Sequence, residues 1–197
     1  MIGRFFGWIY FRISGWRPEG KGPAYDKCVI IAAPHTSNWD LVNMLYLTWA
    51  LRVDVKWLGK KSIFKFPFGW WMRHLGGIAI DRSKRQNVVS QAADLIKSSK
   101  TMCLVVPPEG TRGSGDLWKS GFYHIAREAN VPIVLGYLDY SRKRGGYGQA
   151  VYPTGDVVAD MDKIRTFYRA EMAKFPAMFT VPRLREESPA AEGSQGS

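Results

Sequence analysis

Short apolar runs alternate with longer segments of helical periodicity along most of this chain. The runs are bounded by polar residues, glycine or proline, which is typical of strands buried in a sheet. We expect strands at residues 28–33, 55–58, 77–80, 101–106, 132–140 and 147–152. We expect helices at residues 38–51, 68–75, 87–98, 119–130 and 160–175. This alternation predicts an α/β fold with a mixed, mostly parallel sheet that is flanked by helices.

The N-terminal segment has an apolar pattern of its own. Taken as a helix, it gathers six apolar residues within an arc of roughly 100°, namely Ile2, Phe5, Phe6, Ile9, Ile13 and Trp16. This predicts a short amphipathic helix that lies in a membrane interface with its apolar face in lipid. The alternative is a first helix that packs on the core. The apolar stretches of the chain are shorter than the roughly 20 residues of a membrane span, and the segment lacks the pattern of a signal peptide.

The length of 197 residues and the 46% hydrophobic content fit one domain with one sizeable core. We expect a membrane-surface helix and connector at residues 1–20, the folded domain at 21–182 and a polar, disordered tail at 183–197. The net charge of +11 indicates an anionic partner, such as phosphate, nucleic acid, an acidic protein or lipid headgroups. Between Arg52 and Arg85, nine basic residues stand against two acidic ones and are interleaved with six aromatic residues.

The most informative short motif is His35-Thr-Ser-Asn-Trp-Asp40, directly after the first expected strand. In an ideal helix five residues rotate the chain by about 500°, so the two side chains converge only if His35 lies in a loop and Asp40 begins the next helix. Pro34 ends the strand and the polar residues 36–38 can cap that helix. Asp40 can then accept from Nδ1 of His35 while Nε2 takes a proton from a hydroxyl. The alternative is a capping aspartate beside an unrelated turn histidine.

Two cations also follow expected strands. Arg82 ends the block Gly76-Gly-Ile-Ala-Ile-Asp-Arg82, and Arg112 ends Glu109-Gly-Thr-Arg112. Ligands of α/β sheets bind outside the carboxyl ends of the strands, where these arginines would join His35 and could grip a phosphate through paired bonds. Within the second block, Gly110 leaves room for a close ligand and Thr111 can donate a hydrogen bond. Taken singly, either arginine could instead form a local ion pair with the acidic residue of its own block.

With a fourth block, Val131-Pro-Ile-Val-Leu135, the chain resembles the glycerolipid acyltransferases typified by bacterial 1-acylglycerol-3-phosphate acyltransferase. The resemblance covers about residues 28 to 140 and includes the segment Lys60-Lys-Ser-Ile-Phe-Lys-Phe-Pro-Phe-Gly69. It implies that His35 is the base and Asp40 its orienting partner. It also implies substrate-binding roles for Lys60, Arg82, Glu109, Gly110, Thr111 and Arg112. Two departures from the family pattern, Ala79 and Leu135, bear on the identity of the acceptor rather than on the reaction.

The resemblance implies transfer of a fatty acyl group from acyl-CoA or an acyl carrier protein to the free hydroxyl of a lysophospholipid, most directly 1-acylglycerol-3-phosphate. We expect no metal and no cofactor, an acyl slot lined by aromatic residues of the 57–71 segment, and a peripheral position on the cytoplasmic face of an anionic membrane. The acceptor could also be a lyso-aminolipid or another lysolipid. Three other classes of protein compete with this interpretation. The first is a basic nucleic-acid-binding module, which we do not expect, and the second is a membrane-bound protein without activity. The third is a serine hydrolase, which is disfavoured because the chain contains no Gly-x-Ser-x-Gly motif.

Overall fold

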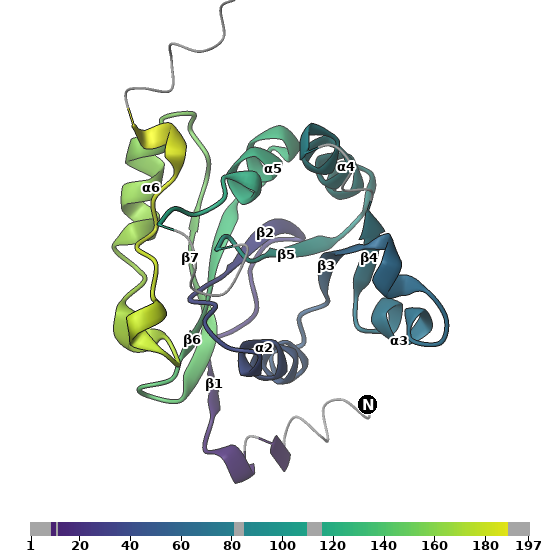
Figure 1. The fold of residues 1–197 in the computed structure, drawn as a ribbon, viewed down its shortest axis with the longest axis vertical. Coiled ribbons are helices and arrows are strands. Elements are labelled where there is room, and N and C mark those ends of the chain that lie inside the picture. Colours follow the sequence, from purple (N-terminus) through teal and green to yellow (C-terminus); the bar gives the residue numbers. More distant parts are fainter. Residues whose placement is uncertain (1–8, 11, 81–84, 110–115, 189–197) are drawn as a thin grey trace, which may run out of the picture.

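The computed structural model describes residues 9–10, 12–80, 85–109 and 116–188, without the side chains of residues 85–87. Within these ranges seven strands form one sheet in the order β1-β7-β6-β2-β5-β3-β4 (Figure 1). The strands are β1 (Arg17–Glu19), β2 (Lys27–Ala32), β3 (Val55–Lys60), β4 (Gly77–Ile80), β5 (Met102–Val106), β6 (Ile133–Asp139) and β7 (Arg144–Val151). All neighbouring strands are parallel except β6 and β7, so the predicted mixed, mostly parallel sheet is confirmed.

Helices cover both faces of this sheet. Helix α2 (Trp39–Ala50) lies on one face, whereas α4 (Arg85–Ser98), α5 (Gly121–Ala129) and α6 (Val157–Arg165) lie on the other (Figure 1). A short 3-10 helix, η1 (Lys61–Phe64), and α3 (Gly69–His74) lie beside the β4 end of the sheet, away from α6. Three further 3-10 turns follow α6, namely η2 (Ala170–Met172), η3 (Pro176–Met178) and η4 (Arg185–Glu187).

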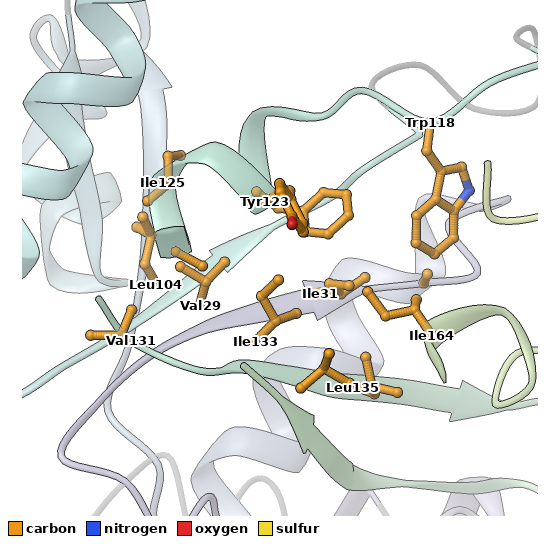
Figure 2. Close-up of a cluster of buried hydrophobic side chains, with 14 of the residues drawn as sticks. Val29, Ile31, Leu104, Trp118, Tyr123, Ile125, Val131, Ile133, Leu135 and Ile164 are labelled. Carbon is orange, nitrogen blue, oxygen red and sulfur yellow. The ribbon is translucent and has the colours of Figure 1, made fainter. Parts of the chain in front are cut away.

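The alternation of side chains along β2 explains why this strand is apolar from Cys28 to Ala32. Val29 and Ile31 enter the larger core, which they share with α4, α5 and α6 (Figure 2). Cys28 and Ile30 point to the opposite face, where Met44 of α2 packs against their cluster. A parallel strand that is buried on both faces reads as a continuous apolar run, and that run was the basis for predicting it.

Two elements differ from the prediction because tertiary contacts decide them. Strand β1 lies within residues 1–20, where we expected only a helix and a connector. It is held at the sheet edge by β7 and by the bond from the Tyr137 hydroxyl to Glu19 (2.7 Å). Helix α6 ends at Arg165 rather than near residue 175. Beyond it Tyr168 is buried, and its hydroxyl donates to the carbonyl of Gly136 (3.0 Å).

The predicted disordered tail begins too early. Leu184 is buried and pairs with Trp118 in a parallel bridge, and Glu187 forms an ion pair with Arg165 of α6. Residues 183–188 therefore belong to the folded domain, since an apolar side chain at position 184 completes the core. Residues 189–197 lie outside the described residues.

The N-terminal helix is described only in part. Residues 9–10 and 12–14 are helical, and none of the described helices is long and apolar enough to cross a membrane. Tyr10 stacks on Tyr46 of α2 (4.2 Å between centroids) and Trp16 is buried, whereas Ile13 is 82% exposed. The segment thus makes contacts with the domain and also carries an exposed apolar residue. Ile2, Phe5 and Phe6 lie outside the described residues, so insertion of this helix in lipid stays a prediction.

Candidate functional site

His35 and Asp40 come together at the carboxyl end of β2 as the spacing predicts. His35 lies in the loop after β2, and Asp40 lies in the first turn of α2. Nδ1 of His35 is 3.3 Å from Oδ2 of Asp40. The carboxylate is buried, whereas 27% of the imidazole is exposed. Within the described residues, the pair therefore has the arrangement of an oriented base whose other ring nitrogen remains available to a substrate.

Asp40 is held by two further groups. The backbone N–H of Ser37 donates to its Oδ2 (2.8 Å), and the hydroxyl of Tyr140 donates to its Oδ1 (2.7 Å). Burial, together with the neighbouring Asp40 carboxylate, raises the pKa of Tyr140, so the phenol keeps its proton and remains a donor. These bonds fix the plane of the carboxylate and direct one oxygen toward His35.

A series of hydrogen bonds between side chains extends from the Asp40 carboxylate to the N-terminal segment. Asn43 of α2 donates to the hydroxyl oxygen of Tyr140 (3.0 Å) and accepts from the hydroxyl of Tyr10 (2.6 Å). Sequence reasoning did not select Tyr140 or Asn43. The spacing of Asn43 from Asp40, one helical turn apart, was a usable signal, whereas Tyr140 is 100 residues from Asp40 and carried none.

Glu109 supports the backbone of the candidate base. It follows β5, the neighbour of β2, and its Oε2 accepts from the backbone N–H of His35 (3.0 Å). The residue is only 6% exposed, and Oε1 has no hydrogen-bond partner among the described residues. Burial raises the pKa of Glu109, and the bond from His35 opposes that effect only in part. The structure thus places Glu109 against the loop of His35.

Replacing Glu109 with glutamine is expected to change how stability depends on pH. A raised pKa in the folded protein means that the stability contributed by Glu109 is full below its unfolded pKa, near 4.3, and is lost as pH rises through the folded pKa. Glutamine can still accept from His35 but does not ionise. Glu109→Gln should therefore gain stability relative to the native chain on going from about pH 4 to about pH 8, as measured by urea unfolding. Parallel pH curves for the two proteins would contradict this expectation.

Of the other candidate substrate-binding residues, Lys60 alone lies within the described part of the chain. Lys60 ends β3 and is exposed, at the same edge of the sheet as His35, because β2, β5 and β3 are parallel neighbours. Arg82, Gly110, Thr111 and Arg112 lie outside the described residues. Strand β4 ends at Ile80 and Glu109 immediately precedes Gly110, so the described flanks of both blocks reach this carboxyl edge.

A large cavity opens beside the candidate base. It has a volume of about 1440 Å³, and its walls include His35, Asp40, Met44 and Val105. Trp57 also lines it. Apart from Trp57, the prediction that aromatic residues of the 57–71 segment line an acyl slot is wrong. Four of them are exposed and absent from the cavity wall, namely Phe66, Phe68, Trp70 and Trp71. The apolar part of the cavity wall includes instead side chains of β2, β5, α2, α4 and α5.

Comparison with known proteins gives consistent matches. The sequence model of the family described as Acyltransferase matches residues 17–135. A 1-acyl-sn-glycerol-3-phosphate acyltransferase of Streptococcus pneumoniae is 34% identical over 116 residues, which are 58% of this chain and 42% of that protein. The enzyme of that name from Saccharomyces cerevisiae is 38% identical over 84 residues, covering 38% of this chain and 27% of that protein. The chain thus spans less than half the length of these two curated relatives.

The fold is shared with a solved structure. It is the crystal structure of the 1-acyl-sn-glycerophosphate (LPA) acyltransferase PlsC from Thermotoga maritima, with a TM-score of 0.55. The match covers 82% of this chain and 73% of that chain at 20% identity. The likeness extends the agreement in architecture beyond the segment that the family model matches.

Proposed function

The chain belongs to the acyltransferase family, and from that premise we propose that it moves a fatty acyl group from a thioester donor to the free hydroxyl of a lysophospholipid. The observation that carries the proposal is the pairing of His35 with the buried carboxylate of Asp40 on the wall of a mostly apolar cavity. We propose 1-acylglycerol-3-phosphate as the acceptor, because the matched relatives carry that substrate in their names.

In the proposed reaction, Nε2 of His35 takes the proton of the acceptor hydroxyl while the hydroxyl oxygen attacks the carbonyl carbon of the thioester. A carbon–oxygen bond forms, the carbon–sulfur bond then breaks, and the departing thiolate recovers the proton from the imidazolium. Asp40 orients the ring and stabilises its charged form. Glu109 and the Ser37 backbone keep the loop and the carboxylate in place. No covalent intermediate on the protein is required.

We further propose that Arg82 and Arg112 bind the phosphate of the acceptor, with Lys60, Gly110 and Thr111 beside them. The donor is acyl-CoA or an acyl carrier protein, and the site of action is the cytoplasmic face of an anionic membrane. The surplus of positive charge supports both the phosphate site and the membrane location, because it attracts phosphate groups and acidic lipids.

The direct test is an assay of the purified chain with 1-acylglycerol-3-phosphate and acyl-CoA or acyl carrier protein as donors. We expect phosphatidic acid to form, as detected by mass spectrometry, and the free thiol to appear in equal amount. Parallel reactions with neutral lysolipids and lyso-aminolipids identify the acceptor. Thioester or ester cleavage without any acylated product would reject the proposal and favour a hydrolase.

Replacing Arg112 with alanine should mainly weaken acceptor binding. We expect the KM for the acceptor to rise by about tenfold or more, since a bidentate charged contact contributes about 1.5–3 kcal/mol, while kcat changes less. Steady-state kinetics with the acceptor varied at a fixed donor concentration measure the two constants. An unchanged KM would remove Arg112 from the phosphate site.

Replacing Tyr140 with phenylalanine should lower kcat by about tenfold and leave both KM values nearly unchanged. The substitution removes the donor to Oδ1 of Asp40, so the carboxylate that directs His35 loses part of its support. Tyr137→Phe is the matched control, since Tyr137 also lines the cavity and its hydroxyl also donates to a carboxylate at 2.7 Å, that of Glu19 rather than Asp40. Equal losses of kcat in the two variants would make the role of Tyr140 merely structural.

A further inference from the structure

Five large apolar side chains are exposed in the nine residues 63–71, which run from η1 through the following turn into the start of α3. Ile63, Phe66, Phe68, Trp70 and Trp71, which we call the aromatic patch, are 42%, 98%, 70%, 71% and 51% exposed. They are five of the thirteen exposed large hydrophobic side chains in the described part of the chain. Scattered apolar residues are normal on a protein surface, but a cluster of this kind marks an interaction site.

The patch stands on a well-packed base. Phe64 is buried between these residues and stacks on Trp57 at 5.8 Å, with the Arg73 guanidinium 5.5 Å from its ring centroid. Gly69 packs so closely on the Phe64 carbonyl that a Cβ would lie 1.9 Å from the oxygen, and its N–H donates to Lys65 (2.8 Å). The aromatic side chains therefore project outward from a defined turn, and their exposure does not come from loose packing of the backbone.

The charges around the patch identify the kind of partner. The sequence from Val55 to Ile80 contains five Lys and Arg residues and no Asp or Glu. Lys60, Lys61 and Lys65 are exposed within it. Phe and Trp combined with Lys and Arg suit the headgroup region of an anionic bilayer, where aromatic rings enter the acyl boundary and the cations meet phosphates. The buried centre of a protein–protein interface is, in contrast, depleted in lysine.

The position of the patch gives this surface a use. It follows β3, whereas His35 follows β2 and Glu109 follows β5, and these three strands are parallel neighbours. All three segments therefore leave the same edge of the sheet. We propose that the aromatic patch is a docking surface for an anionic lipid bilayer, separate from the N-terminal helix, which holds the carboxyl edge of the sheet against the membrane.

The test measures binding of the full chain to vesicles of phosphatidylcholine with about 30% phosphatidylglycerol. The variant F66A/F68A/W70A removes three exposed side chains that take no part in the core. We expect its partition coefficient to fall by about tenfold or more. The control Y152A/V158A/V181A removes three exposed apolar side chains elsewhere and should stay within about twofold of the native chain. Native-like binding of the first variant, or equal loss in both, would overturn the proposal.

Charge and self-association supply two further readouts. Lys65→Glu should weaken binding to the anionic vesicles by several-fold and leave binding to pure phosphatidylcholine unchanged; an equal effect on both would overturn the role given to charge. Sedimentation velocity tests a second copy of the chain as the occupant. The proposal would be overturned if the native chain were a dimer, the F66A/F68A/W70A variant were a monomer and vesicle binding were unaltered. The aromatic patch would then bind a second copy of the chain and not the bilayer.

The vesicle assay does not depend on turnover, so it fails or succeeds separately from the acyltransferase proposal. The F66A/F68A/W70A variant should also keep native kcat on a short-chain acceptor that is dissolved as monomers, because the patch is absent from the cavity wall. Its rate on acceptor embedded in vesicles should fall in proportion to binding. A loss of rate on the dissolved acceptor would place these residues in the site instead and contradict a pure docking role.

Discussion

Replacing His35 with alanine is expected to lower kcat for acyl transfer by about a thousandfold or more. General-base catalysis contributes about 10²–10⁴-fold, and here His35 is also the group that returns the proton to the departing thiolate. The fold should survive, because the His35 N–H still donates to Glu109 and Asp40 keeps its bonds from Ser37 and Tyr140. Single-turnover kinetics with saturating donor and acceptor measure the chemical step directly.

The matched control for this change is His124→Ala. Its Nε2 also lies beside a carboxylate, 3.4 Å from Oε1 of Glu186, and both residues line the same cavity as His35, but both side chains are well exposed to solvent. An exposed pair of this kind contributes little to stability. We expect nearly native kcat for His124→Ala and an unchanged urea midpoint for both variants. Retained turnover in His35→Ala, with binding of the acceptor intact, would refute the assignment of the base.

The second large effect is expected for Asp40→Asn, with a fall in kcat of about a hundred- to a thousandfold. Asparagine is nearly the same size, so the packing of α2 is kept. It no longer carries the charge that stabilises the imidazolium, and its amide can present a donor to Nδ1 and so favour the wrong tautomer of His35. Both KM values should change little, because Asp40 is buried and acts through His35.

Two readouts separate this positioning role from a loss of folding. The free energy of unfolding of Asp40→Asn should fall by about 1–3 kcal/mol, since the hydrogen bonds from Ser37 and Tyr140 compete for a single remaining acceptor. The pH dependence of kcat/KM should also change, because the substitution removes the negative charge that lies beside the imidazole of His35. A variant with native kcat and a native pH profile would show that His35 works without this carboxylate.

The agreement between sequence and structure is closest where the physical signal is local. Strand β2 was predictable because its residues 28–32 lie between two apolar layers and form a continuous apolar run. The convergence of His35 and Asp40 was predictable because a proline-terminated strand, a polar turn and a helix start leave one arrangement for a five-residue spacing. The exposed aromatic patch was misread as an acyl slot, because composition reports that a residue is apolar but not which way it points.

The sequence by itself determined the alternation of strands and helices and the carboxyl-edge position of the candidate base, since these depend on periodicity and short-range spacing. Its four motif blocks also identified the family through their resemblance to known members. Only the tertiary structure decided that Tyr140 supports Asp40, that Glu109 holds the loop of His35 and that Leu184 completes the core. Tyr140 is 100 residues from Asp40, and Glu109 is 74 residues from His35. Leu184 is 66 residues from Trp118, with which it pairs. Such pairs meet because the parallel sheet brings distant strands to one edge, and no local pattern in the chain records which side chains then face each other.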